Sequence, residues 1–283
     1  MTDLSKKLLT AVRSNIVRKT LSIFLLVVDN FQLFRAMQFS SPLDETSGLW
    51  DDYEEMSRNP ATLLDAMFVK VVNLLTKANR PSAVITDVDS DEIDLPNDGF
   101  DLIVQAKAVD ATLATWPNFV PASWIPVQVK ADNVQPSVLK AGFYGDSCDV
   151  YPDVIVCSTW NEWRVARLKV LSLIASAGND ETKLQAMQTI QRLVDGICAS
   201  VPSTLGDRMK PGPLYEAQIT YPTGSGKLVS KAHQTTASAY GGWYLFAPFK
   251  EIMKVAMYLR KGQQEWVSGQ LRRLAISYDV IPT

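Results

Sequence analysis

Histidine and cysteine are scarce in this sequence, which contains only His233 and the three cysteines Cys148, Cys157 and Cys198. A Ser-His-Asp or Cys-His catalytic system would have to use His233, which lies in a polar, turn-rich stretch without a nucleophile elbow. We expect His233 to be a surface or helix-capping residue. An odd number of cysteines without a spacing pattern predicts reduced, structural thiols inside the cell. The same counts argue against a histidine-based metal site, and we predict no zinc site.

Long apolar runs are also lacking, because no segment reaches the roughly 18 residues that a membrane-spanning helix needs. The longest run, residues 21–28, is followed by Asp29, and we interpret it as part of a buried helix. We expect no membrane partner and a cytoplasmic protein, with a nuclear location left open. The formal net charge of -2 gives no concentrated basic surface, so we expect no nucleic-acid binding by this chain alone.

Two stretches resemble known ion-binding or phosphate-binding loops but lack required residues. Residues 83–100 are acidic, yet Glu92 and Asp98 stand where an EF-hand loop needs Gly and Glu, so we predict a mobile acidic loop without calcium. Residues 224–227 read Gly-Ser-Gly-Lys, but Tyr221 and Leu228 occupy positions that a phosphate loop fills with Gly and with Ser or Thr. We therefore expect a simple turn there and no bound cofactor.

Apolar residues at helical spacing dominate the rest of the chain, and we find no convincing alternating strand and no repeat. The 283 residues, 47% of them hydrophobic, can bury a substantial core. We predict an all-α fold, a single helical bundle over residues 1–283 with a Pro- and Trp-rich covering loop at 116–136. Pro202 is expected to end a helix, Pro248 to kink one, and Gly262 to cap one at its C-terminus. Helices are expected at 4–39, 49–57, 61–76, 102–115, 152–177, 182–199, 239–260 and 263–277.

The segment 152–177 is the expected central helix, and it contains Trp160-Asn161-Glu162-Trp163-Arg164. We place Pro152 in its first turn. If Asn161 and Arg164 are buried, they need hydrogen-bond partners. Backbone groups, carboxylates such as Asp149 or Asp153, or a ligand carbonyl would serve. Core packing is the default role for the large aromatics, and lining of an apolar interhelical cavity is the alternative. These aromatics are Trp160, Trp163, Trp243 and Tyr244.

Three stretches, taken in order, resemble the C-terminal fungal-specific domain of zinc-cluster (Zn₂Cys₆) transcription factors. The first, 21–81, joins an apolar helix, a Trp50-containing segment and a helix that ends near Arg80-Pro81. The second, 144–171, has tyrosines before Trp-Asn-x-x-Arg. The third comprises 195–205 (DGICASVPSTL), 241–248 (GGWYLFAP) and the closing helix. The resemblance implies a regulatory helical bundle. The family's DNA reader is a six-cysteine zinc cluster, which the three cysteines here cannot form.

Two functions fit a bundle without a metal, cofactor or triad motif. The one we predict is a cofactor-independent cyclase or pericyclase of fungal secondary metabolism, which would hold an apolar metabolite in reactive geometry between helices. The other is a non-catalytic, regulator-like domain that binds a ligand or partner protein; a homodimer is left open. The enzyme hypothesis assigns catalytic roles to Arg164, Asn161 and Tyr244. It assigns substrate binding to Trp160, Trp163, Trp243, Tyr240 and Tyr151.

Overall fold

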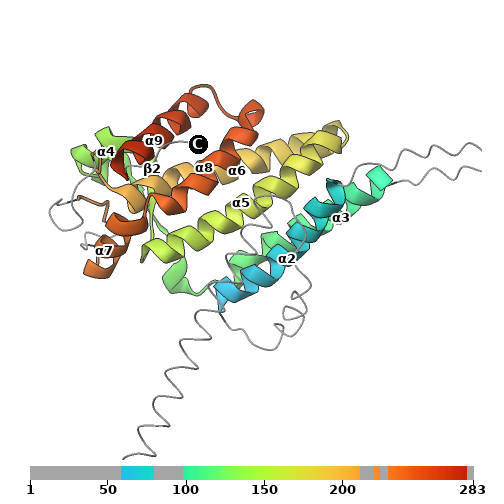
Figure 1. The fold of residues 1–283 in the computed structure, drawn as a ribbon, viewed down its shortest axis with the longest axis horizontal. Coiled ribbons are helices and arrows are strands. Elements are labelled where there is room, and N and C mark those ends of the chain that lie inside the picture. The colour runs from blue at the N-terminus through green and yellow to red at the C-terminus, as the bar shows by residue number, and fades with distance from the viewer. Residues whose placement is uncertain (1–58, 80–97, 211–218, 224–228, 279–283) are drawn as a thin grey trace, which may run out of the picture. The chain divides into compact units, whose positions relative to one another are not determined.

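The computed structural model describes residues 59–79, 98–210, 219–223 and 229–278, and helices dominate them (Figure 1). The fold is therefore mainly all-α, as predicted. Where we expected one domain over 1–283, chain contacts give two compact units, Met1–Asp91 and Glu92–Thr283, which are described separately. The predicted N-terminal helices, the acidic loop up to residue 97 and the Gly-Ser-Gly-Lys turn lie outside the described residues.

The described part of the first unit is helix α2 (Pro60–Ala78). The side chain of Asn59 caps it by accepting a hydrogen bond from the N–H of Ala61 at 3.0 Å. Pro60 fits the first turn because that turn needs no N–H donor. The helix predicted at 61–76 is confirmed.

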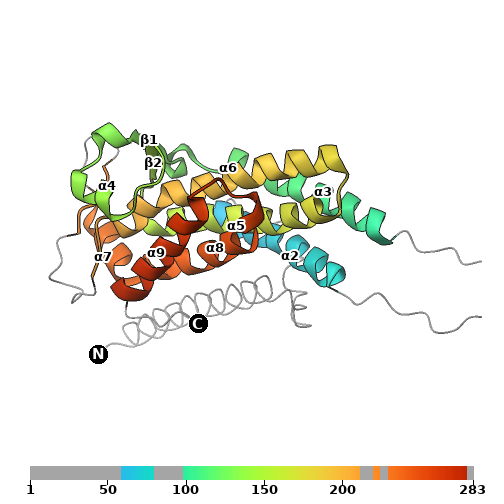
Figure 2. The ribbon, with the colours of Figure 1, turned by 90° about the horizontal axis from the view of Figure 1, so that it is seen from above.

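Helix α5 (Val154–Ala177) is the centre of the second unit. It packs against α6 (Asp180–Leu205), α3 (Asp98–Thr115) and α8 (Trp243–Lys254), which surround it in both ribbon views (Figures 1 and 2). Side chains on several of its faces are buried, which confirms the predicted central helix. Asp153 caps the helix by accepting from the N–H of Val156 at 2.8 Å, so Pro152 precedes the first turn instead of lying in it.

The prediction that Pro202 ends a helix is wrong, because α6 continues through Pro202 to Leu205. An interior proline removes one backbone hydrogen bond and costs about 3 kcal/mol in an exposed helix. Here the last turn is buried, with Val201 and Leu205 among the core residues, and this burial offsets the cost. The helix ends at Gly206, whose φ of 53° suits glycine and whose N–H donates to the Pro202 carbonyl.

The expected helix 239–260 is two helices, α7 (Lys231–Tyr240) and α8. The chain breaks at Gly241-Gly242, and Pro248 lies inside α8. A Cβ atom at Gly242 would clash with the Tyr278 ring, so this position requires glycine. Gly262 precedes the last helix, α9 (Gln263–Ser277), and has the left-handed conformation with φ 81°. We expected it to cap the C-terminus of a helix, and that prediction is wrong.

The Pro- and Trp-rich segment forms short 3₁₀ turns and a small sheet. Strand β1 (Val127–Lys130) pairs antiparallel with β2 (Ser147–Val150), with Val127 opposite Val150. The helix α4 (Pro136–Gly142) lies between them in the chain, and β2 packs on α6. Four-residue strands are too short to give a clear alternating pattern, which is why the sequence did not reveal them.

Two helical glycines test how tightly α5 and α6 pack. A Cβ atom at Gly196 of α6 would lie 2.7 Å from Nε of Arg164, whereas one at Gly269 of α9 would have no heavy atom within 4 Å. We expect Gly196→Ala to lower the free energy of unfolding by about 1–3 kcal/mol through overpacking. The control Gly269→Ala should raise it by about 0.5–1 kcal/mol through helix propensity. Urea denaturation followed by circular dichroism measures both, and equal effects would contradict the packing described.

Candidate functional site

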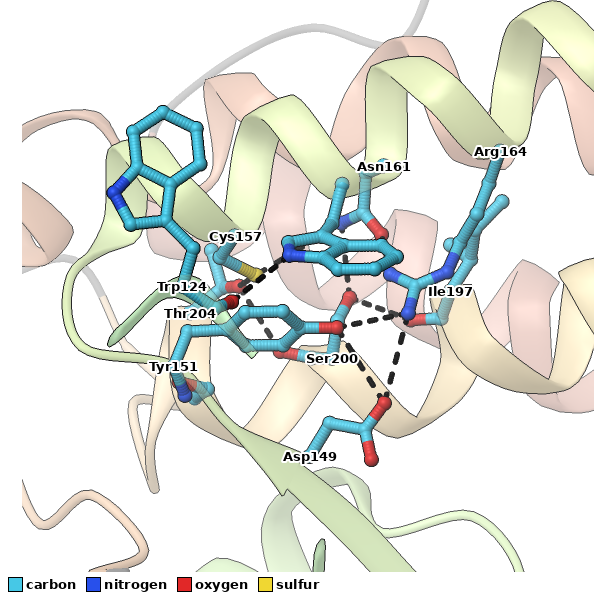
Figure 3. A network of polar contacts seen from close by, with 11 residues as sticks. Trp124, Asp149, Tyr151, Cys157, Asn161, Arg164, Ile197, Ser200 and Thr204 are labelled. Atoms are coloured by element: carbon cyan, nitrogen blue, oxygen red, sulfur yellow. Dashed lines mark hydrogen bonds and ion pairs between the residues drawn. The ribbon is translucent and has the colours of Figure 1, made fainter. Parts of the chain in front are cut away.

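The guanidinium of Arg164 is the centre of a buried polar network between α5 and β2 (Figure 3). Its Nη1 donates to Oδ1 of Asn161 at 2.8 Å, one turn earlier on the helix. Its Nη2 donates to the Tyr151 hydroxyl at 2.9 Å and lies 3.6 Å from Oδ2 of Asp149. The Tyr151 hydroxyl in turn donates to Oδ2 of Asp149 at 3.4 Å. Asp149 is thus the carboxylate partner, one of the two that the sequence suggested.

The network continues into α6 through Asn161. Its Nδ2 donates to Oγ of Ser200 at 2.9 Å, and that hydroxyl donates to the Ile197 carbonyl at 2.7 Å. Oγ1 of Thr204 donates to the Ser200 carbonyl at 3.0 Å and lies 3.3 Å from Sγ of Cys157. The Arg164 network, defined as Asp149, Tyr151, Cys157, Asn161, Arg164, Ser200 and Thr204, therefore joins β2, α5 and α6.

The Trp160 side chain covers the Arg164 guanidinium on the side of the covering segment. The Trp160 ring centroid is 5.6 Å from Cζ of Arg164, within cation–π range. Nε1 of Trp160 donates to the Trp124 carbonyl at 2.9 Å, and Nε1 of Trp163 donates to the Leu113 carbonyl at 2.7 Å. Trp116 contacts the rings of both Trp160 and Trp163. The indole N–H groups of Trp160 and Trp163 are used to fix the fold.

Burial determines the protonation states in the network. It raises the pKa of Tyr151, so this hydroxyl stays neutral. Burial also raises the pKa of Asp149, and the charge of Arg164 offsets only part of that rise. Burial raises the pKa of Cys157 to about 11, which leaves an unreactive thiol at neutral pH. All three cysteines are free and buried, as predicted for structural thiols.

Two of the remaining predicted site residues, Trp243 and Tyr244, lie elsewhere. Trp243 is 55% exposed, and its ring contacts Phe246, 5.8 Å between centroids. Tyr244 packs against the buried cluster of Val154, Tyr221 and Ala237. The side chain of Tyr240 is outside the described part. The structure therefore brings Tyr151, Trp160, Asn161, Trp163 and Arg164 together and does not place Trp243 or Tyr244 in the Arg164 network.

Sequence reasoning missed the contribution of α6 to this network. Gly196, Ser200 and Thr204 recur every four residues and share one helix face, where Gly196 leaves room for Arg164 and the two hydroxyls bond to the network. The signal was present in the string DGICASVPSTL, whose small and polar residues have a helical period.

His233 is fully buried, so the expectation of a surface residue is wrong, whereas its imidazole bonds to a carbonyl in the last turn of α6, as a capping residue would. It lies in the first turn of α7, where Oγ of Ser230 accepts from its backbone N–H at 3.1 Å. The imidazole is turned toward α6, and Nε2 lies 2.8 Å from the Ser203 carbonyl. Burial lowers the pKa of His233, although Ser203 and Asp153 partly counteract this.

No protein-family model matches this sequence, and neither the curated proteins nor the solved structures compared with it give a match. Within the described ranges, no helix is both long and apolar enough to cross a bilayer. The same residues contain no group of three or more His, Cys, Asp or Glu side chains placed to hold a metal ion.

Replacement of Arg164 by alanine tests whether the network holds the fold together. We expect Arg164→Ala to lower the free energy of unfolding by about 3–5 kcal/mol, because Asp149 and Asn161 lose their buried partner. The control Arg192→Ala, on the exposed face of α6, should change it by less than about 0.5 kcal/mol. Urea titration followed by tryptophan fluorescence measures both. A fully stable Arg164→Ala protein would show that the network is not structural.

The buried histidine predicts a pH dependence of stability. Because the folded-state pKa of His233 is below the ordinary value near 6.5, the unfolded chain takes up the proton first as the pH falls. The contribution of the neutral His233 side chain to the free energy of unfolding is thus present at neutral pH and is lost on acidification. We expect the stability difference between wild type and His233→Gln to shrink between about pH 7.5 and 5. A difference that is constant over this range would exclude the effect.

Proposed function

We propose that this chain is a non-catalytic regulatory domain related to the C-terminal domain of zinc-cluster transcription factors, and that it binds a partner or ligand. The supporting observation is the use made of Trp-Asn-x-x-Arg. Asn161 and Arg164 bond to each other and to Tyr151, Asp149 and Ser200. The motif therefore holds α5 to β2 and α6. Such a structural role is expected of a motif that belongs to the fold of a regulatory domain.

The cyclase hypothesis remains a second proposal, with an apolar metabolite as substrate and no cofactor. It needs polar groups aimed at a reacting molecule. Arg164 and Asn161 are instead directed at protein atoms, and Tyr244 is in another cluster. These contacts favour the regulatory proposal because catalysis by the same groups would require the network to open. For either function, we propose a cytoplasmic or nuclear location.

A reporter assay tests the regulatory proposal directly. The full chain is fused to an unrelated DNA-binding module in fungal cells, and transcription from the matching promoter is measured. We expect the fusion to change reporter output several-fold relative to the DNA-binding module alone. The variant Arg164→Ala should reduce the change in reporter output in proportion to its loss of folded protein. The control Arg192→Ala should keep the full change.

A turnover assay addresses the alternative. The purified chain is incubated with metabolite extract, and consumed or isomerised compounds are sought by mass spectrometry. The regulatory proposal predicts no turnover. Turnover by the wild type, combined with an inactive reporter fusion that is folded, would replace the regulatory proposal by the cyclase hypothesis.

A further inference from the structure

Unpartnered buried polar groups are concentrated in one region of the second unit. Five fully buried side-chain nitrogen or oxygen atoms lack a hydrogen-bond partner in the described part of the chain, and four of them belong to Glu92–Thr283. These four are Nε of Arg208, the hydroxyl of Tyr221, Nδ1 of His233 and Oγ of Ser277. We call these residues the α7 cluster. Buried polar groups in native proteins are normally satisfied, so a concentration of exceptions calls for a missing binding partner.

Contacts around α7 join Tyr221 with His233 and place Arg208 beside the end of α9. The rings of Tyr221 and His233 meet edge to face, 5.2 Å between centroids. The guanidinium carbon of Arg208 lies 4.4 Å from the centroid of the Tyr278 ring, next to Ser277 in the chain. The Tyr278 hydroxyl donates to the carbonyl of Ala237 at 3.0 Å, so the end of α9 is fixed to α7.

Arg208 is itself attached to α7, because its Nη1 donates to the Ser238 carbonyl. The segment that carries Tyr221 is attached to the turn after α6, since the backbone N–H of Asp207 donates to the Thr220 carbonyl at 2.9 Å. The cluster thus draws its members from the turn after α6, the segment 219–223, α7 and the end of α9.

The α7 cluster also has an unbalanced charge. Arg208 is 8% exposed, yet it makes no ion pair with any carboxylate of the described residues. The adjacent Asp207 uses Oδ1 to accept from the N–H of Thr220 at 2.9 Å. Nearby Arg273 is also buried without an ion pair, and donates to the carbonyls of Gly206 and Arg208. Asp207 is a nearby negative charge for Arg273, so two buried cations share one carboxylate. By contrast, Arg164 lies beside Asp149. A buried cation without a counter-charge is costly, so the missing partner should be negative.

The four unpartnered atoms define the chemistry of that partner. Nε of Arg208 is a donor, and the hydroxyls of Tyr221 and Ser277 can donate. Since Nε2 of His233 faces a carbonyl oxygen, it carries the proton, and Nδ1 of the neutral ring is an acceptor. We propose that the α7 cluster binds a small oxyanion that also carries a hydroxyl group. Arg208, Tyr221 and Ser277 would hold the oxyanion, and His233 would accept from the hydroxyl. A hydroxycarboxylate and hydrogenphosphate share this chemistry.

Ligand-dependent melting of the purified full chain tests the proposal. Glycolate, inorganic phosphate, acetate and chloride are each added at equal ionic strength, and the melting midpoint is recorded. We expect a saturable rise in midpoint with glycolate or phosphate and little or none with chloride. A response to glycolate alone identifies a hydroxycarboxylate site, and a response to phosphate alone identifies a phosphate site. Acetate, which lacks the hydroxyl, should act more weakly than glycolate.

Matched tyrosine variants separate a ligand site from a structural role. Tyr221→Phe removes an unpartnered hydroxyl, so without ligand it should melt no lower than wild type, while its anion-induced rise should shrink several-fold. The control Tyr151→Phe removes a partnered hydroxyl and should melt lower but keep the full rise. Arg208→Gln should lose the anion-induced rise in melting midpoint, and Ser277→Ala should show a smaller rise. If Arg208→Gln does not fold, Ser277→Ala takes its place in the test.

Two results would overturn the proposal. One is an absence of any rise beyond that with chloride, and a lower midpoint for Tyr221→Phe would then indicate a buried water. The other is a full anion-induced rise in Arg208→Gln or in both Tyr221→Phe and Ser277→Ala. Neither result depends on the reporter or turnover assays, because melting measures binding alone.

Discussion

The second unit depends on the burial of one cation, the guanidinium of Arg164. A charge taken out of water must be paired and hydrogen-bonded, and here the partners come from three different elements. Asp149 is on β2, Tyr151 lies between β2 and α5, and Asn161 connects to Ser200 on α6. These elements cannot separate without exposing an unpaired buried charge. The network therefore specifies one arrangement of the sheet and the two central helices.

This constraint accounts for several residue choices around it. Position 196 lacks a side chain because Arg164 occupies the space beside α6. Trp160 covers the guanidinium and, through its indole N–H, fixes the covering segment at Trp124. The tryptophans thus link the covering segment to the network. An apolar side chain could fill the same volume but could not make the hydrogen bond to the Trp124 carbonyl.

Periodicity revealed the long helices because α5 and α6 bury apolar residues at helical spacing over many turns. It failed where tertiary contacts overrule local preference. Pro202 remains helical because its turn is buried, and position 242, between α7 and α8, requires glycine because the Tyr278 ring lies against it. The partner Asp149 was among the sequence's suggestions, because a buried arginine requires a carboxylate. Grouping Trp243 with Trp160 failed because aromatic content does not reveal which face of a helix is exposed.

The Arg164 network and the α7 cluster both contact the last turns of α6, and they differ in one respect that bears on function. In the Arg164 network the cation has its counter-charge, and its neighbours satisfy one another within the protein. In the α7 cluster the cation Arg208 has none, and Tyr221 and His233 each retain an unused group. A closed network stabilises but has little left to offer a ligand. An open cluster costs stability unless something binds there. The more informative place for ligand binding is therefore the α7 cluster, which the sequence motifs did not indicate.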